Sequence, residues 1–251
     1  MATIVSLHAH PDDEALLTAG WLAQRAAAGD RVVLAFATDG AAGLAGAGHL
    51  GDLGDLGRTR RAEADVSAAA LGVARVVWLG YADSGMAGAP STGPGRLADA
   101  DVETAARVVA DVLDDEDADL LTGYDDRGGY GHPDHLQVHR IARRAQELAT
   151  RRPLLLEATL DRTWLVRLLR VVRPLARRLP GLTLPGDDIY SPRGPALLRI
   201  DVRDRLAAKR AALAAHATQA GGGVRTLRLL LALPRPLARR LLGVEWFLRV
   251  P

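Results

Sequence analysis

The first 150 residues alternate between short apolar runs and longer stretches in which apolar residues recur every three or four positions. The short runs are rich in β-branched residues, which is typical of strands buried on both faces. The predicted strands are residues 3–8, 31–38, 75–81 and 119–124. The stretches with helical spacing, and therefore the predicted helices, are residues 14–28, 58–71, 102–113 and 135–149.

Strands that alternate with helices pair in parallel through right-handed crossovers. Strands that are apolar on both faces need helices on both sides of the sheet. The pattern therefore predicts an α/β fold with a Rossmann-like, doubly wound, mainly parallel sheet. Ligands of such sheets bind beyond the carboxyl ends of the strands, where the strand order reverses. Two glycine-rich segments, residues 39–57 and 85–95, follow predicted strands and are expected to border that site.

The pattern is looser after residue 150. It predicts strands at 153–160 and 196–202, helices at 164–179 and 204–218, and an interrupted helical stretch at 224–242. No internal repeat and no convincing linker divides the chain, so we expect a single domain over residues 1–251. Residues 1–150 would form its acidic core, and residues 151–251 would form a basic part that covers the site.

Composition narrows the chemistry. The chain has 251 residues, of which 48% are hydrophobic and 25% charged, which indicates a globular protein and excludes a disordered or collagen-like chain. It contains no cysteine, so disulfides and thiolate metal sites are excluded, and any metal must be held by histidines and carboxylates. The sequence has no apolar run of about 18 residues and no signal-peptide pattern, so we expect a cytoplasmic protein.

The net charge of +2 conceals two parts of opposite charge. Residues 1–150 carry 12 arginines and 23 acidic residues, a net charge of −11, whereas residues 151–251 carry 20 basic and 7 acidic residues, a net charge of +13. Two segments of the basic part, 164–178 and 224–242, place arginines opposite leucine and valine. We expect solvated helices that pack on their own domain, and the alternative is weak association with a membrane surface.

The first chemically informative segment is HAHPDDE at residues 8–14, where the first predicted strand meets the first predicted helix. Pro11 cannot continue a strand inside a sheet, so the strand ends here and the side chains around Pro11 are presented beyond its carboxyl end. One of the adjacent carboxylates, Asp12 and Asp13, can bind a cation together with an imidazole while its neighbour accepts a proton. The alternative is an aspartate pair that only caps the helix.

The second segment is YDDRGGYGHPDH at residues 124–135, which follows the fourth predicted strand and opens another helix. His132 and His135, with Asp134 between them, can supply a metal ligand, an acid or base, and a carboxylate that orients an imidazole. Alone, the segment is also compatible with a solvated turn. Four of the seven histidines fall in these two segments, both at the carboxyl ends of predicted strands, which favours one shared metal site.

Together, HAHPDDE and YDDRGGYGHPDH resemble the motifs of the PIG-L/LmbE-like family of zinc-dependent N-deacetylases, which act on N-acetylglucosaminyl conjugates. The resemblance extends through Arg60-x-x-Glu63, residues 83–86 and 200–202, Lys209 and residues 216–219, but not through 150–198. The mycothiol-pathway enzymes are the nearest subgroup; one deacetylates the glucosaminyl-inositol precursor and another cleaves thiol conjugates. Ala41 departs from the pattern, because relatives commonly carry a glutamate there.

The resemblance implies a role for each matching residue. It implies that zinc is bound by His10, Asp13 and His135. It implies that Asp12 is the general base, that His132 acts on the tetrahedral intermediate or the leaving amine, that Asp134 orients His132, and that Tyr130 is an oxyanion donor. It also implies that Arg60 and Asp83 bind the sugar or its aglycone.

The chemistry of these residue types is compatible with the roles that the resemblance implies. Three protein ligands leave zinc an open position for water, as in catalytic sites, and a neighbouring carboxylate can then activate that water. The same ligand set accepts Fe²⁺ or Co²⁺. His139, one helical turn after His135, is expected at a helix surface. His8 and Glu14 are expected to be structural, and His49 and His216 structural or exposed.

The sequence therefore predicts a zinc-dependent hydrolase that removes the acetyl group from a small-molecule conjugate of N-acetylglucosamine. One alternative keeps the site but cleaves another amide, as in a thiol conjugate. An alternative from a different class is a basic module that binds lipid or nucleic acid. We expect no nucleic-acid partner, because no recognised motif is present and aromatic residues make up only 4% of the chain.

Overall fold

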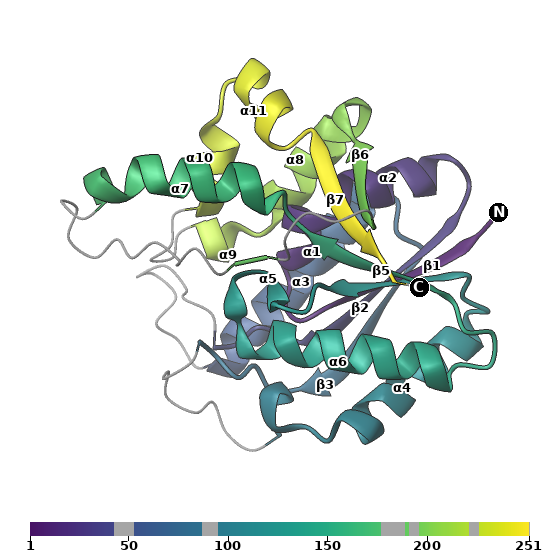
Figure 1. Cartoon of the computed structure of the whole chain (residues 1–251). Coiled ribbons are helices and arrows are strands. Elements are labelled where there is room, and N and C mark those ends of the chain that lie inside the picture. The colour runs from purple at the N-terminus through teal and green to yellow at the C-terminus, as the bar shows by residue number, and fades with distance from the viewer. Residues whose placement is uncertain (43–52, 87–94, 177–188, 191–195, 221–225, 251) are drawn as a thin grey trace.

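The computed structural model describes residues 1–42, 53–86, 95–176, 189–190, 196–220 and 226–250. Seven strands form one sheet with helices on both sides (Figure 1). The strands are β1 (Thr3–His8), β2 (Arg31–Thr38), β3 (Arg75–Tyr81), β4 (Leu120–Tyr124), β5 (Leu154–Thr159), β6 (Leu197–Asp201) and β7 (Val244–Arg249). The first helices are α1 (Asp13–Leu17), α2 (Ala19–Ala27), α3 (Leu53–Leu71), α4 (Val102–Asp115), α5 (Gly128–Gly131) and α6 (Pro133–Leu148). The later ones are α7 (Arg162–Ala176), α8 (Leu206–Ala215), α9 (Ala217–Ala220), α10 (Thr226–Ala232) and α11 (Arg235–Leu241).

The strand order is β3-β2-β1-β4-β5-β7-β6, and the first five strands in this order run parallel. β7 pairs antiparallel with both β5 and β6. The predicted doubly wound, mainly parallel α/β sheet is therefore confirmed. The chain builds outward from β1 to β3, then returns to add β4 and β5 on the other side of β1. The strand order thus reverses between β1 and β4, which is where such sheets bind ligands.

The strand and helix predictions for the first part agree closely with the structure. The bounds of β1, β2 and β3 are those predicted, and β4 begins one residue later. The predicted helix at 14–28 is instead two helices, because the chain breaks at Thr18, whose φ is −130° and whose hydroxyl donates to the Glu14 carbonyl. The glycine-rich loops lie largely outside the described residues, at 43–52 and 87–94.

One strand, β7, was not predicted. Its inward-facing positions hold Glu245 and Phe247. Because one of these buried residues is charged, the sequence lacks the alternation of apolar and polar residues that predicts a strand. Across the sheet, inward side chains such as Leu34 and Phe36 are completely buried, and each such burial contributes about 1.5–3 kcal/mol to folding. No helix in the described part of the chain is both long and apolar enough to cross a bilayer.

A buried ion pair within the second part of the chain is anchored to helices of the first part. Lys209 of α8 lies 2.6 Å from Glu245 of β7, and both side chains are at most 2% exposed. The carboxylate of Glu245 also accepts hydrogen bonds from the backbone amides of Gly20 and Trp21, each at 2.8 Å. These amides belong to the first turn of α2, which has no earlier carbonyls to bind them. Glu245 therefore caps α2 from a strand more than 220 residues away.

We expect Lys209→Met to lower the free energy of unfolding by about 3–5 kcal/mol, because it leaves the Glu245 carboxylate buried without its cation. Urea denaturation followed by circular dichroism measures the change. Arg107→Met is the matched control, since Arg107 is 64% exposed and pairs with Glu103 at the surface. The control should keep the parental midpoint. Equal midpoints for the parent and Lys209→Met would show that this pair does not stabilise the fold.

Candidate active site

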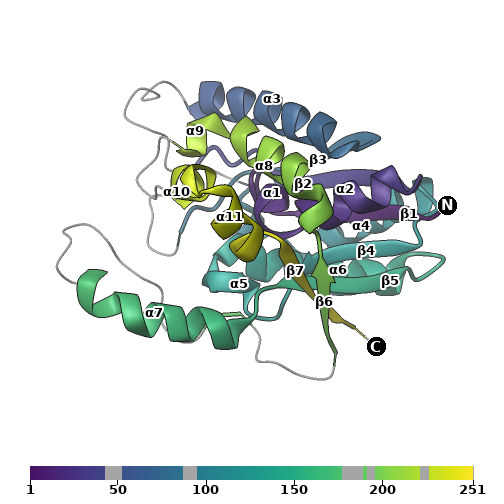
Figure 2. The same ribbon diagram turned by 90° about the horizontal axis from the view of Figure 1, so that it is seen from above.

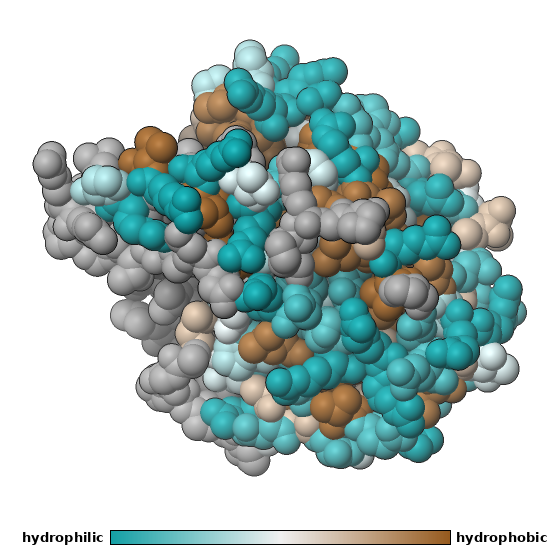
Figure 3. All heavy atoms as spheres, in the orientation of Figure 1, coloured by the Kyte–Doolittle hydropathy of each residue, from teal (hydrophilic) through white to brown (hydrophobic). Residues whose placement is uncertain are grey.

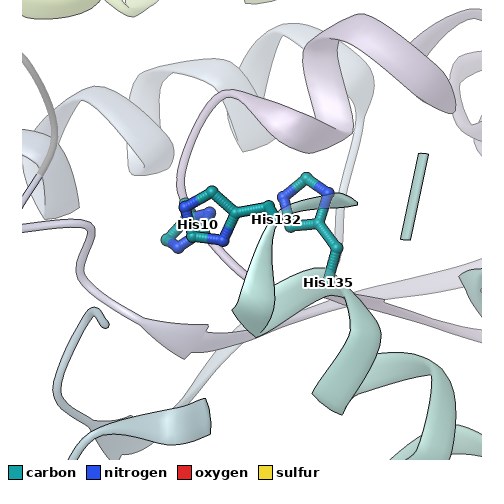
Figure 4. A group of neighbouring side chains, drawn as sticks. All are labelled: His10, His132 and His135. Atoms are coloured by element: carbon teal, nitrogen blue, oxygen red, sulfur yellow. The ribbon is translucent and has the colours of Figure 1, made fainter. Parts of the chain in front are cut away.

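The two predicted motifs meet at the reversal point of the sheet. β1 ends at His8 and β4 ends at Tyr124, and these strands are parallel neighbours, so the segments that follow them leave the sheet side by side. His10 comes from the segment after β1, whereas His132 and His135 come from the start of α6. Figure 4 shows the three imidazoles turned toward one another. Their ring centroids lie 4.7–5.5 Å apart.

The turn between β4 and α6 depends on two glycines. Gly128 and Gly129 have φ values of 55° and 67°, and a Cβ at Gly128 would lie 2.8 Å from the backbone nitrogen of Leu136. Buried Asp125 accepts the amide of Gly129 at 2.9 Å, which holds the turn closed. The chain then enters α6 through Pro133, with His132 as the residue that caps the helix.

Asp13 connects His10 and His135. Its Oδ2 lies 3.3 Å from His10 Nδ1 and 3.3 Å from His135 Nε2, and it accepts a hydrogen bond from the Tyr124 hydroxyl at 2.8 Å. His135 is 1% exposed, and its Nε2, although 3.3 Å from Asp13, makes no hydrogen bond to any described residue. Leaving such an atom unpaired costs about 1–3 kcal/mol. A metal ion would use this nitrogen, so the donor set fits a metal.

His10 also contacts carboxylates through its other nitrogen. Nε2 lies 3.1 Å from Asp134 Oδ2 and 3.4 Å from Asp83 Oδ1. Burial lowers the pKa of His10, but hydrogen bonds to the surrounding carboxylates raise it well above its usual value. Among the described residues, two sets of three donors lie close enough to hold an ion; both contain His10, and neither is the predicted set of His10, Asp13 and His135. One set adds His132 and His135, and the other adds Asp83 and Asp134.

Asp12 has a strained backbone that is fixed from two sides. Its φ is 107°, in a region that non-glycine residues rarely adopt. Its amide donates to Glu14 at 3.0 Å, while Arg60 donates to the Pro11 carbonyl at 2.6 Å and lies 3.6 Å from the Asp12 carboxylate. That carboxylate makes no helix-capping hydrogen bond, so the capping alternative is wrong for Asp12. Burial raises the pKa of Asp12 to about 6, although Arg60 opposes this shift.

Arg60 and Asp83 are more buried than a sugar-binding role would require. They are 2% and 3% exposed. Arg60 also donates to the Gly40 carbonyl, and Asp83 accepts the amides of Ala42 and Gly85 at 3.0 and 2.8 Å. These contacts fix the loops around the site. Direct contact of either residue with a sugar stays a prediction.

The structure changes the expected partner of Asp134. Its carboxylate accepts hydrogen bonds from His10 and from the Ser84 amide, at 3.1 and 3.0 Å, and contacts His132 only through its backbone amide, which donates to His132 Nδ1 at 3.2 Å. Asp134 begins a helix, so its amide rather than its carboxylate faces the capping imidazole. Because Nδ1 accepts, the neutral ring carries its proton on Nε2. Burial lowers the pKa of His132 to about 4.

The remaining predicted residue, Tyr130, is partly accessible. It is 45% exposed, and its ring lies 5.2 Å from that of His135. His139, by contrast, points to the Tyr124 carbonyl and to Glu157, at 3.0 and 3.1 Å. His8 is buried, and its Nε2 is hydrogen-bonded to the Ser6 hydroxyl at 2.8 Å. Burial lowers the pKa of His8 to about 4. His49 lies outside the described residues.

Sequence reasoning missed the pair of Glu14 and His216. Both side chains are completely buried, and Glu14 Oε1 lies 2.6 Å from His216 Nε2 and accepts the Ser67 hydroxyl at 2.6 Å. The second oxygen of Glu14 holds the Asp12 amide. Hence the basic part of the chain reaches the segment that presents Asp12. The family resemblance covers both Glu14 and residues 216–219, but it did not indicate that the two side chains meet, because they lie 202 residues apart.

A family model matches the part of the chain that carries both motifs. Residues 5–146, more than half of the chain, match the family model described as PIG-L, GlcNAc-PI de-N-acetylase. The chain belongs to the PIG-L family. All residues of both motifs lie inside the matched range. The match ends within α6, so the whole basic part of this PIG-L protein, residues 151–251, lies beyond it.

Two relatives named 1D-myo-inositol 2-acetamido-2-deoxy-alpha-D-glucopyranoside deacetylase support the same family. The protein from Nocardiopsis dassonvillei is 36% identical over 238 residues, which cover 85% of this chain and 83% of the relative. The protein from Thermobifida fusca is 36% identical over 271 residues, which cover 97% of this chain and 91% of the relative. The similarity therefore extends well beyond the matched family model.

Solved structures share the fold. N,N'-diacetylchitobiose deacetylase from Pyrococcus horikoshii has a TM-score of 0.61 at 19% identity and covers 98% of this chain and 82% of its own. GalB, the 4-carboxy-2-hydroxymuconate hydratase from Pseudomonas putida, has a TM-score of 0.62 at 18% identity and covers 100% and 98%. Because a deacetylase and a hydratase share it, the fold alone does not decide the reaction.

We expect Asp12→Gly to be more stable than Asp12→Ala by about 1 kcal/mol, because glycine adopts a φ of 107° without strain. Both variants lack the carboxylate and lose the same contact with Arg60, so they differ only in the Cβ atom. Urea denaturation of the two variants measures the difference. A more stable Asp12→Ala would show that the backbone at this position is not strained.

Proposed function

We propose that this PIG-L protein is a zinc-dependent hydrolase that removes the acetyl group from an N-acetylglucosamine-type conjugate. One observation carries the proposal: Asp13 lies 3.3 Å from a nitrogen of each of His10 and His135, and the nitrogen of His135 makes no hydrogen bond within the described part of the chain. Ligands of a tetrahedral zinc ion with bonds of 2.0–2.1 Å are about 3.3 Å apart. The two distances from Asp13 match this separation and support an ion shared by Asp13 and the two histidines.

His10, Asp13 and His135 would hold the ion, and Asp134 would orient His10 through the contact with its Nε2. When bound, zinc polarises the amide carbonyl and lowers the pKa of water. Three protein ligands leave a position open for these roles. The same donors accept Fe²⁺ or Co²⁺, and zinc is the ion that we propose.

The other side chains of the site would transfer protons and donate hydrogen bonds during the reaction. Asp12 takes a proton from the attacking water, and the departing nitrogen needs one proton, so the reaction balances as amide and water to acetate and amine. His132 keeps its Nε2–H available for the tetrahedral intermediate or the leaving amine, since Nδ1 is occupied. Tyr130 is partly exposed and would donate its hydroxyl to the developing oxyanion.

The relatives favour acetyl removal from an amino sugar over cleavage of another amide. The names of the two relatives specify an acetamido sugar linked to inositol. We therefore propose a glucosaminyl conjugate of a polyol as the substrate class. Acetate release from N-acetylglucosaminyl-inositol, N,N'-diacetylchitobiose and N-acetylglucosamine, by metal-loaded and chelated protein, tests this. Release from none of them, with cleavage of a thiol-conjugate amide, would overturn the acetyl-sugar assignment.

We expect His135→Ala to lose the metal, because it removes one of the three proposed ligands. Metal analysis of protein purified in the presence of zinc measures the stoichiometry. His139→Ala is the matched control, since it removes an imidazole one helical turn away and should retain the parental metal content. Metal loss in Asp83→Ala with retention in His135→Ala would instead place the ion between His10, Asp83 and Asp134.

We expect Asp12→Asn to lower turnover by about 10²–10⁴-fold with the metal retained, because it removes the proposed base without changing the size of the side chain. His132→Ala should have an effect in the same range. Steady-state acetate release together with metal analysis separates loss of chemistry from loss of the ion. Turnover of Asp12→Asn near the parental value at saturating metal would show that Asp12 is not the base.

A further inference from the structure

The arginines of α10 and α11 differ from those of the first part of the chain. In the first part, arginines lie against carboxylates, as Arg31 does with Glu116 at 2.7 Å and Arg144 with Glu103 at 2.6 Å. Residues 226–243 contain no acidic residue. Four exposed arginines of this segment form no ion pair with any described residue, namely Arg228, Arg235, Arg239 and Arg240. This segment therefore presents positive charge with which no described carboxylate pairs.

Leucines are exposed on the same two helices. Leu227 and Ala238 are buried in a small apolar cluster with residues of α8, which anchors α10 and α11. Leu229 and Leu237 remain 66% and 43% exposed. Figure 3 shows apolar and hydrophilic residues side by side at the top of the molecule, over these helices. The surface of α10 and α11 thus combines unpaired arginines with exposed leucines.

This surface lies at the end of the molecule that carries the site. The carboxyl ends of β1 and β4 point toward the side of α5, α9 and α10 (Figure 1). The amphipathic helix α7 extends from the body on the same side, as Figure 2 shows from above. Val171 of α7 is 78% exposed, and Arg167 beside it is also exposed. Basic and apolar residues therefore flank the site from two segments of the chain.

We propose that α10 and α11, assisted by α7, bind the surface of an anionic lipid bilayer. Each arginine near such a surface contributes about 1 kcal/mol, and exposed leucines gain further by leaving water. A nucleic acid would neutralise the arginines but would leave the leucines against phosphates. An anionic bilayer would neutralise the arginines with its headgroups and would also remove the leucines from water.

Vesicle sedimentation of the full chain tests the surface without any activity measurement. We expect the protein to pellet with phosphatidylcholine–phosphatidylglycerol vesicles at low salt and to stay in the supernatant with phosphatidylcholine alone. Arg239→Glu with Arg240→Glu should weaken binding at least about tenfold. Arg107→Glu with Arg151→Glu is the matched control, because it changes the net charge equally at arginines paired with carboxylates.

Two results would overturn the proposal. One is no pelleting with anionic vesicles at low salt, and the other is equal weakening by both charge-reversal pairs. Leu229→Ser with Leu237→Ser should weaken vesicle binding and leave any oligonucleotide binding unchanged. Tight oligonucleotide binding without vesicle binding would identify a nucleic-acid surface instead. Circular dichroism and metal content of each variant confirm that the fold and the site are intact, so failure here does not bear on the deacetylase proposal.

Discussion

The parallel pairing of β1 with β4 is the constraint on which the site depends. Its register places Ser6 opposite Thr122, and their hydroxyls lie 2.7 Å apart in the sheet interior. Any shift of that register would move His10 relative to the start of α6 by about 3.3 Å per residue, which is as large as the spacing between candidate ligands. The two motifs, more than 100 residues apart in sequence, can therefore share an ion only while this strand pair is intact.

Buried charges then fix the segment that carries Asp12. Glu14 binds the Asp12 amide and is itself held by His216, while Arg60 holds the Pro11 carbonyl. Each of these groups is buried, so removing any one of them leaves its partner uncompensated. The pair of Glu14 and His216 thus brings a side chain of the basic part against a carboxylate of the acidic part. Four arginines of α10 and α11, by contrast, stay exposed at the surface.

Most of the fold could be predicted from the sequence, and so could the residues that gather at the site. β1, β2 and β3 have the predicted bounds because their apolar runs are continuous and end at turn residues. β7 was missed because Glu245 occupies a core position, and the role of His216 was missed because its partner is set by tertiary packing. The partner of the Asp134 carboxylate could not be predicted either, because it depends on whether the amide or the carboxylate of this first-turn residue faces His132.

The pair of Lys209 and Glu245 has a practical consequence. Lys209 is the only lysine of the chain, and its ammonium group is buried between a carboxylate and the Leu16 carbonyl. An amine-reactive reagent therefore finds no exposed lysine while α8, β7 and α2 remain together. Acylation of this side chain, distinguished by peptide mapping from acylation of the α-amino group, therefore reports opening of that junction and acts as a chemical probe of local unfolding.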